Sequence, residues 1–101
     1  MFLINGMKAI LVMRNRKPSK NYYDDEDIRE IPIKVCPFGV DELVKFGLQT
    51  VPEAQGYFIV HRLCLAQKGD QLKFREKTYS ILKVQGAWIF NRVEFNVLAV
   101  K

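Results

Sequence analysis

The sequence predicts a mainly β fold, a small antiparallel β-barrel or two-sheet sandwich of about six strands. The strongest observation lies in residues 69–100, where apolar and polar residues alternate with period two between short turns of Gly, Asp and charged residues. The chain has 101 residues, of which 49% are apolar and 12% aromatic. That length and composition suit the core of one domain over residues 1–101 and argue against global disorder. A compact barrel or sandwich is how so short a set of strands buries its apolar faces.

The first strand is expected at residues 8–13, which are mostly apolar. Residues 1–6 either extend this strand or form an N-terminal extension. A long polar loop, residues 14–30, follows and joins the first two strands. Loops of this length are usually either functional or poorly ordered.

The long loop carries two charge blocks of opposite sign, with two tyrosines between them. The basic block is Arg14, Arg16, Lys17 and Lys20, the tyrosines are Tyr22 and Tyr23, and the acidic block is Asp24, Asp25, Glu26 and Asp27. One interpretation is a solvent-exposed loop whose opposite charges partly neutralise each other. The other is a loop that protrudes to touch a partner or DNA.

The middle of the chain predicts two further strands and a short helix. Residues 31–36 alternate as a half-buried strand, and Pro32 places it near an edge or at its start, with a break at Pro37. Residues 41–46 have helical composition, with Asp41 early and Lys45 late, which complements a helix dipole. Because six residues are few, this is one helical turn or a loop. Residues 57–63 are an almost continuous apolar run, which indicates a strand buried on both faces.

The final meander supplies three more strands. Leu72 and Phe74 alternate with Lys73 and Arg75, so the two cations are expected on the face away from the apolar pair. A second run follows at residues 79–84, and a third at residues 90–100 after a predicted break at Gly86, Ala87 and Trp88. Trp88 is therefore expected near a turn or bulge, where it either anchors an interface or caps the barrel.

No constellation of residues points to catalysis, a metal or a cofactor. Cys36 and Cys64 have no second Cys or His at metal-ligand spacing, and their apolar surroundings favour buried thiols over a disulfide. The lone histidine, His61, lies within a strand pattern and has no nucleophile or acid motif to act with. The acidic run at residues 24–27 does not match a calcium loop, and the glycines are too scattered to cradle phosphate. We therefore expect a non-enzymatic protein without a cofactor.

The formal net charge of +5 is compatible with an anionic partner such as DNA, but it is also an ordinary solubility charge for a small domain. No run of about 20 apolar residues predicts a membrane span, so no membrane partner is expected. The first residues make a poor signal peptide, and the cytoplasm is the default compartment.

Several stretches together resemble the C-terminal half of small tailed-phage neck proteins, the head-closure or head-tail joining family. They are Gly69 to Phe74, a charged turn, Lys77 to Leu82 with its Tyr79 and Ile81, then Trp88, and a closing strand at residues 93–100. The upstream segment, residues 52–60, is similar to the strand that precedes the Gly-Asp turn in that family. The resemblance covers about half of the chain.

The resemblance implies a structural role in the virion neck after synthesis in the host cytoplasm. Family members assemble as rings, usually of six copies, between the portal and its adaptor on one side and the tail on the other. They close the DNA-filled head, and a loop between early strands can project into the channel. Here residues 14–27 would be that loop: its basic block would contact packaged DNA non-specifically, and its acidic block would pair with basic residues of a neighbouring copy.

Two other functions remain open at this stage. A small nucleic-acid-binding β-barrel of the OB or cold-shock type would present exposed aromatics beside cations on one sheet face. In this chain the aromatic residues occupy the inward positions of the predicted strands, which disfavours that class. The third hypothesis is a tail terminator or another tail protein of the same virion. The sequence does not distinguish this role from the neck role.

Overall fold

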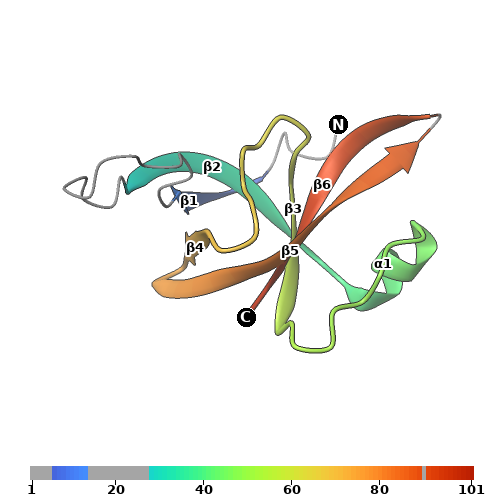
Figure 1. Cartoon of the computed structure of the whole chain (residues 1–101), viewed down its shortest axis with the longest axis horizontal. Helices are drawn as coiled ribbons and strands as arrows, with labels where there is room; N and C mark the ends of the chain where they lie inside the picture. The colour runs from blue at the N-terminus through green and yellow to red at the C-terminus, as the bar shows by residue number, and fades with distance from the viewer. Residues whose placement is uncertain (1–5, 14–27, 90) are drawn as a thin grey trace, which may run out of the picture.

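The described residues of this computed structural model, 6–13, 28–89 and 91–101, form a closed antiparallel barrel of six strands with one short helix (Figure 1). In chain order the elements are β1 (Met7–Met13), β2 (Arg29–Phe38), α1 (Val40–Lys45), β3 (Gly56–His61), β4 (Gln71–Phe74), β5 (Lys77–Ile89) and β6 (Arg92–Val100). Around the barrel the strand order is β1-β2-β3-β6-β5-β4. The predicted mainly β class, the six strands and the short helix are confirmed, and the barrel rather than the sandwich is formed.

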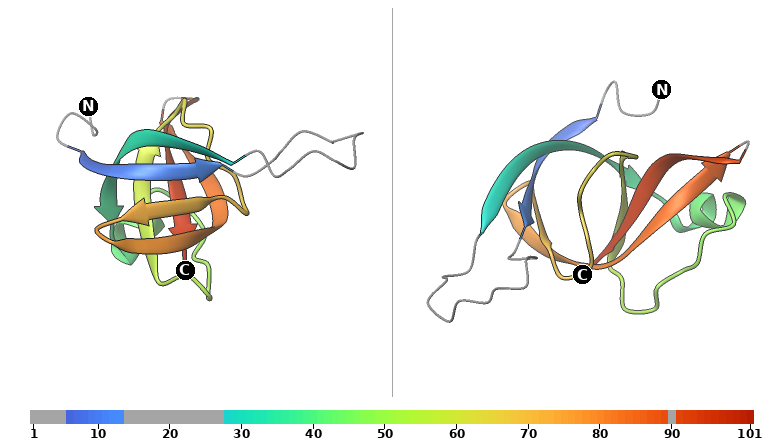
Figure 2. Two further views of the ribbon diagram at one scale, coloured as in Figure 1. Left: turned by 90° about the vertical axis from the view of Figure 1, so that its left-hand side faces the viewer. Right: turned by 45° about the horizontal axis from the view of Figure 1, so that its top comes forward.

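Two long strands close the barrel by pairing with different partners along their length (Figure 2). The first part of β2 pairs with β1, and Cys36 to Phe38 pair with β3. In the same way β5 begins beside β4 and continues beside β6. Since β2 reaches β3 only from Cys36 onward, Pro32 lies where one side of β2 is locally open, as expected for a residue without a backbone N–H.

The core consists of two apolar clusters, and β3 contributes side chains to both. Phe58 and Val60 enter the first cluster, which includes Leu11, Leu72 and Leu98. Tyr57 and Ile59 enter the second, which lies under α1 and includes Leu43 and Phe95. Four consecutive residues of β3 are therefore buried, which confirms the predicted burial of this strand on both faces.

The strand boundaries differ from the prediction in two places. The predicted break at residues 86–88 is wrong, because β5 runs without interruption to Ile89. Gly86 pairs with Asn96, and a Cβ on Gly86 would meet the Val93 side chain at 3.4 Å, an ordinary contact distance, so this position is a regular part of the strand. The irregularity is a register shift between Ala87 and Trp88, and the chain reverses only afterwards, at Asn91, with φ +65°.

The second boundary to be corrected is the end of β2. The strand continues through Pro37, which pairs with Phe58, and ends at Phe38. Pro37 is exposed, whereas Phe38 is buried in the second cluster. Burial of that ring keeps the strand regular past the proline, which local propensity alone does not predict.

The two cysteines are thiols that are partly rather than fully buried. Cys36 packs against the second cluster, whereas Cys64 packs against the first. Both therefore serve as small apolar side chains at the margins of the core.

Helix α1 ends in a Schellman motif centred on Gly47. The Gly47 N–H donates to the Val44 carbonyl at 3.0 Å, and the Leu48 N–H donates to the Leu43 carbonyl at 3.0 Å. Gly47 has φ +71°, the left-handed region that this motif requires at the residue after the C-cap. The turn thereby places Leu43 and Leu48 together against the second cluster.

Replacing Gly47 by Ala is expected to lower the free energy of unfolding by about 1–2 kcal/mol, because a Cβ is disfavoured in the left-handed conformation. Chemical denaturation of both proteins measures the difference. The matched control is Gly39→Ala at the other end of the helix, where φ is −83° and no atom lies within 4 Å of the added Cβ. Equal effects of the two substitutions would contradict this account of the helix end.

Candidate functional site

The predicted loop between the first two strands is present as a connection between β1 and β2. The ten residues proposed in it as partner contacts, Arg14, Arg16, Lys17, Lys20, Tyr22, Tyr23, Asp24, Asp25, Glu26 and Asp27, all lie outside the described residues. Its two anchors are described: Met13 and Arg29 pair with each other at the shared end of β1 and β2. This end of the barrel is at the left of Figure 1.

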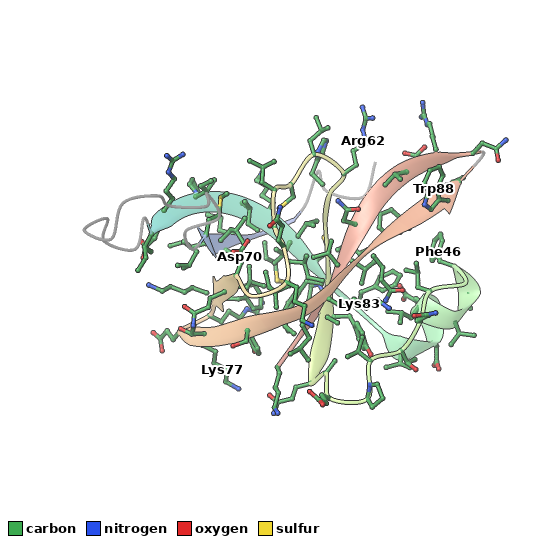
Figure 3. All side chains as sticks on the ribbon, in the orientation of Figure 1. Phe46, Arg62, Asp70, Lys77, Lys83 and Trp88 are labelled. Atoms are coloured by element: carbon green, nitrogen blue, oxygen red, sulfur yellow. The ribbon has the colours of Figure 1, made fainter. Side chains whose placement is uncertain are left out.

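The β5–β6 hairpin extends from the opposite side of the barrel and carries Trp88 (Figure 3). Ala87 and Phe95 form an inward pair that is fully buried. The next position is different, because Trp88 has 65% of its surface exposed. So exposed an indole does not cover the barrel core, and of the two interpretations of Trp88 the interface anchor is favoured over the cap.

Side-chain contacts support the hairpin on its outer face. The Asn96 Nδ2 donates to the Arg62 carbonyl at 3.2 Å, which fixes the β3–β4 connection beside β6. Arg92 and Glu94 form an ion pair at 3.1 Å along the same strand. The strand pairing and the buried Phe95 hold the backbone around Trp88, so the indole is presented from a supported element rather than from a loop.

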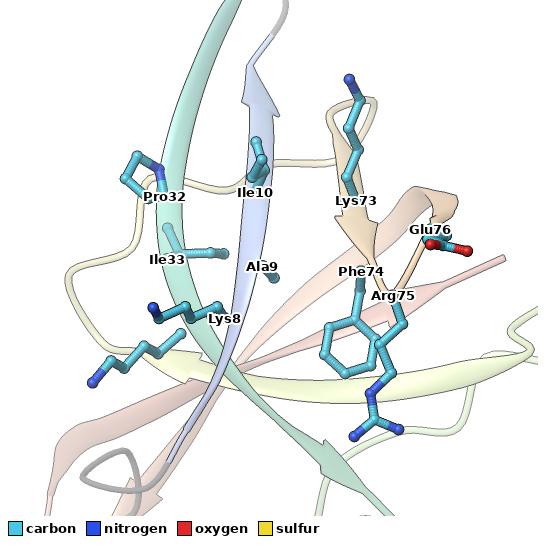
Figure 4. A pocket seen from close by; sticks show the side chains of 10 residues that line it. Lys8, Ala9, Ile10, Pro32, Ile33, Lys73, Phe74, Arg75 and Glu76 are labelled. Carbon is cyan, nitrogen blue, oxygen red and sulfur yellow. The ribbon is translucent and has the colours of Figure 1, made fainter.

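A groove crosses the opposite part of the barrel, over β1, β2 and β4 (Figure 4). Apolar side chains make up much of its lining, with Ile10 and Pro32 exposed and Phe74 almost buried. It lies where β1 and β4 separate, because their pairing covers Ile10 to Val12 but not the earlier residues of β1. The remaining lining residues are Lys8, Ala9, Ile33, Lys34, Lys73, Arg75 and Glu76.

The charges of the groove are strongly unbalanced. Four of its lining residues are cations and one, Glu76, is an acid. Lys73 is paired with Glu30 just outside the groove, with 3.0 Å between Nζ and Oε1. Lys8 and Lys34 face each other directly in the β1–β2 ladder, and neither has a carboxylate partner within the described part of the chain. Like charges at directly opposed positions of a sheet repel each other. An anion bound between Lys8 and Lys34 would therefore reduce the repulsion between the two ammonium groups.

Arg75 is held in place at the mouth of the groove. Its guanidinium lies 5.1 Å from the centroid of the Phe74 ring and donates to Met7 Sδ at 3.3 Å. Arg75 and Glu76 both have positive φ, 49° and 66°, as in a two-residue turn between paired Phe74 and Lys77. The turn directs Arg75 across the gap toward β1, which adds a fixed cation to the groove.

The described residues hold no arrangement that suggests catalysis. Within them no group of His, Cys, Asp or Glu is placed to bind a metal ion. His61 is exposed, and its Nδ1 accepts the backbone N–H of Leu63 at 3.1 Å. No helix in this part of the chain has the length and apolar character needed to cross a bilayer. The chemistry offered by the described surface is binding through apolar contacts and cations.

Trp88 and two of the groove cations, Lys73 and Arg75, are recognisable in the sequence, whereas Lys8 and Lys34 are not. Each of these lysines is an outward residue of an alternating strand. Only the register of β1 against β2 brings them together, and no signal in either strand alone fixes that register.

No protein-family model, curated protein or solved structure matches this chain.

Proposed function

We propose that this protein is a structural component of a tailed-phage neck, which assembles as a ring of several copies between the portal or its adaptor and the tail. It acts by assembly rather than catalysis and is incorporated into the virion after synthesis in the host cytoplasm. Six copies is the ring size that the resemblance implies. The resemblance to neck proteins supplies the biological setting, and the surface of the barrel supports the assembly role.

The observation that carries the proposal is that two different contact surfaces lie at opposite ends of the described barrel. The projecting hairpin with Trp88 is at one end, and the groove and the anchors of the 14–27 segment are toward the other (Figures 1 and 4). A ring forms when one surface of each copy meets a different surface of the next, so that every interface is head-to-tail. Two separated, unlike surfaces on one small barrel satisfy that requirement.

Trp88 has the properties of an interface anchor. Tryptophan is enriched among the few side chains that dominate binding energy. Within the described residues it is the one aromatic side chain in the exposed class, since the Phe and Tyr residues there are buried or half-buried. An exposed tryptophan on a supported hairpin is therefore suited to anchor a contact with a partner.

The same burial pattern weighs against the nucleic-acid-binding barrel. Single-stranded nucleic acid binds to exposed aromatic rings that stack on successive bases. The aromatic rings of the barrel strands point inward, as predicted: Phe38 and Phe95 pack in the second cluster, and Phe58 and Phe74 pack in the first. A single exposed ring, that of Trp88, lies away from the cation-rich groove and does not make a stacking platform beside it.

The Trp88→Ala variant tests the proposal. We expect the wild-type chain at high concentration to form discrete rings, visible by electron microscopy and by the mass in solution. We expect the variant to shift strongly toward the monomer, because loss of an anchor of this kind costs about 2 kcal/mol or more at each interface. Leu63→Ala, at a side chain that is 69% exposed but lies on the β3–β4 connection, is the matched control and should assemble normally.

Two outcomes would contradict the proposal. One is a chain that stays monomeric at all concentrations and does not join purified heads to tails. The other is tight, salt-sensitive binding of an oligonucleotide by the monomer, which would favour the nucleic-acid-binding barrel.

A further inference from the structure

We propose that the groove over β1, β2 and β4 binds the acidic segment of residues 22–27 from a second copy of this chain. The inference deepens the ring proposed above and rests on it for the presence of a neighbouring copy. It assigns a position and a chemistry to one side of the contact between copies.

The groove and the acidic segment are complementary in charge, and this is the main argument for their contact. The groove has four cations against one acid among its lining residues, and the opposed pair Lys8 and Lys34 has no carboxylate partner among the described residues. The segment of residues 22–27 has the sequence Tyr-Tyr-Asp-Asp-Glu-Asp, with four carboxylates in a row. A carboxylate between the two lysines would replace their mutual repulsion by two attractions.

The apolar part of the groove fits the same segment. Ile10 is 38% exposed and Pro32 is exposed beside it, and both lie between the lysine pair and Lys73. Tyr22 and Tyr23 directly precede the acidic run. A tyrosine ring suits such a site, because its apolar body covers aliphatic carbon while its hydroxyl remains in water.

The open side of β1 adds a backbone component. β1 pairs with β4 only from Ile10 to Val12, whereas Met7, Lys8 and Ala9 pair with β2 alone. An extended segment lying along these residues can bond to backbone groups that none of the described strands pairs with on this side. An extended peptide, rather than a globular surface, is therefore the occupant that matches the shape of the site.

The number of residues between Arg29 and the acids limits how far the segment of the same copy can extend toward the site. Lys34 is five residues along β2 from Arg29, which is about 17 Å at 3.3 Å per residue. Asp24 is also five residues from Arg29, and reversing the chain direction uses at least two of them, which leaves a reach of about 10 Å. Asp25, Glu26 and Asp27 are closer to Arg29 and reach less far. A segment from another copy is not subject to this limit, which makes a second copy the better-placed donor.

Phosphate groups of a nucleic acid are the main competing ligand for these cations. The one aromatic residue that lines the groove, Phe74, is 7% exposed and lies under Arg75. It offers no face for base stacking, which makes an acidic peptide the better match.

Binding of a fluorescent peptide with the sequence of residues 20–29 tests the proposal. By fluorescence anisotropy we expect saturable binding to the intact chain that weakens as salt is added. A control peptide in which the four acids are replaced by their amides should bind at least about tenfold more weakly, since each 1.4 kcal/mol of lost attraction is a factor of ten.

The double variant Lys8→Glu, Lys34→Glu tests the site. It exchanges one like-charged pair for another, so its fold should be kept, and we expect peptide binding to fall at least about tenfold. Lys8→Ala, Lys34→Ala is the milder second variant if the first proves unstable. Lys45→Glu, Lys68→Glu makes the same change of net charge at exposed positions outside the groove and should bind like the wild type.

A charge exchange between copies completes the test. A chain whose four acids at residues 24–27 are replaced by lysine should lose self-association, as should the Lys8→Glu, Lys34→Glu chain. Mixing the two should restore association, because the reversed groove of one chain then meets the reversed segment of the other.

The proposal is overturned if the peptide does not bind, if it binds the groove variant as tightly as the wild type, or if an oligonucleotide rather than the peptide depends on Lys8 and Lys34. These results are separate from the test of the ring. Rings that persist in the groove variant contradict the groove assignment alone. Peptide binding to the groove by a chain that never forms rings or joins heads to tails contradicts the neck role alone.

Discussion

Removal of residues 98–101 is expected to abolish folding, which is the largest effect we predict. Leu98 and Val100 are fully buried, and Ala99 is 2% exposed. The same residues are paired on both sides, with β3 through Gly56 to Phe58 and with β5 through Ile81 to Val84. The truncated chain would lose several buried side chains and would open the barrel. Burial of each of the larger ones, Leu98 and Val100, stabilises the fold by about 1.5–3 kcal/mol. Far-ultraviolet circular dichroism and proton NMR should show an unfolded chain at 25 °C.

Removal of Lys101 alone is the matched control. Lys101 is exposed and exchanges two backbone hydrogen bonds of 3.0 Å with Ser80. Its loss should cost about 1–3 kcal/mol and leave the barrel folded. A folded, cooperative domain lacking residues 98–101 would show that the end of β6 is not needed to close the sheet, contrary to this account.

The alternation of apolar residues predicted most of the barrel because most strands bury one face. Leu72 and Phe74 are buried and Lys73 is exposed, as the period of two requires. The exception, β3, was also predictable, since its continuous apolar run matches a strand whose two faces enter two clusters. Closure into a barrel rather than a sandwich depends on β2 and β5 each pairing with two different partners along their length, and that is not encoded in any single strand.

The predicted break at residues 86–88 shows how far local signals reach. An irregularity is present near Trp88, as a register shift between Ala87 and Trp88, but β5 continues through it and Gly86 pairs with Asn96. Whether such a signal means a bulge or the end of a strand is visible only once the register of β5 against β6 is known. The same limit applies to the groove, whose two opposed lysines come from different strands.

The Gly-Asp pair at residues 69 and 70, which contributes to the resemblance with neck proteins, has a structural role here. Gly69 has φ +96°, which suits glycine, and Asp70 is 3% exposed. The Asp70 Oδ2 accepts the Gln67 N–H at 3.0 Å, so the side chain closes the turn before β4. Because Gly and Asp suit such a turn for local reasons, the pair carries information on fold more than on partners.

Phe95→Ala is expected to destabilise the barrel by about 3–5 kcal/mol, the range for loss of a fully buried phenylalanine. Phe95 is 1% exposed, and its ring lies 6.0 Å from that of Phe38 and 5.3 Å from that of Phe46, with edge-to-face geometry in both pairs. The cavity would lie at the centre of the second cluster, where β6 cannot move inward without breaking its pairing with β3 and β5. Chemical denaturation followed by far-ultraviolet circular dichroism measures the loss.

Trp88→Ala provides the comparison on the same hairpin. Because 65% of the Trp88 surface is already in water, its removal should change the free energy of unfolding by less than about 1 kcal/mol, as for surface positions in general. If the anchor role is correct, Trp88→Ala loses assembly and keeps stability, whereas Phe95→Ala loses stability first and assembly only as the fold is lost. A stability loss as large for Trp88→Ala as for Phe95→Ala would mean that the indole serves the core of the barrel, and the case for a ring built through this hairpin would fail.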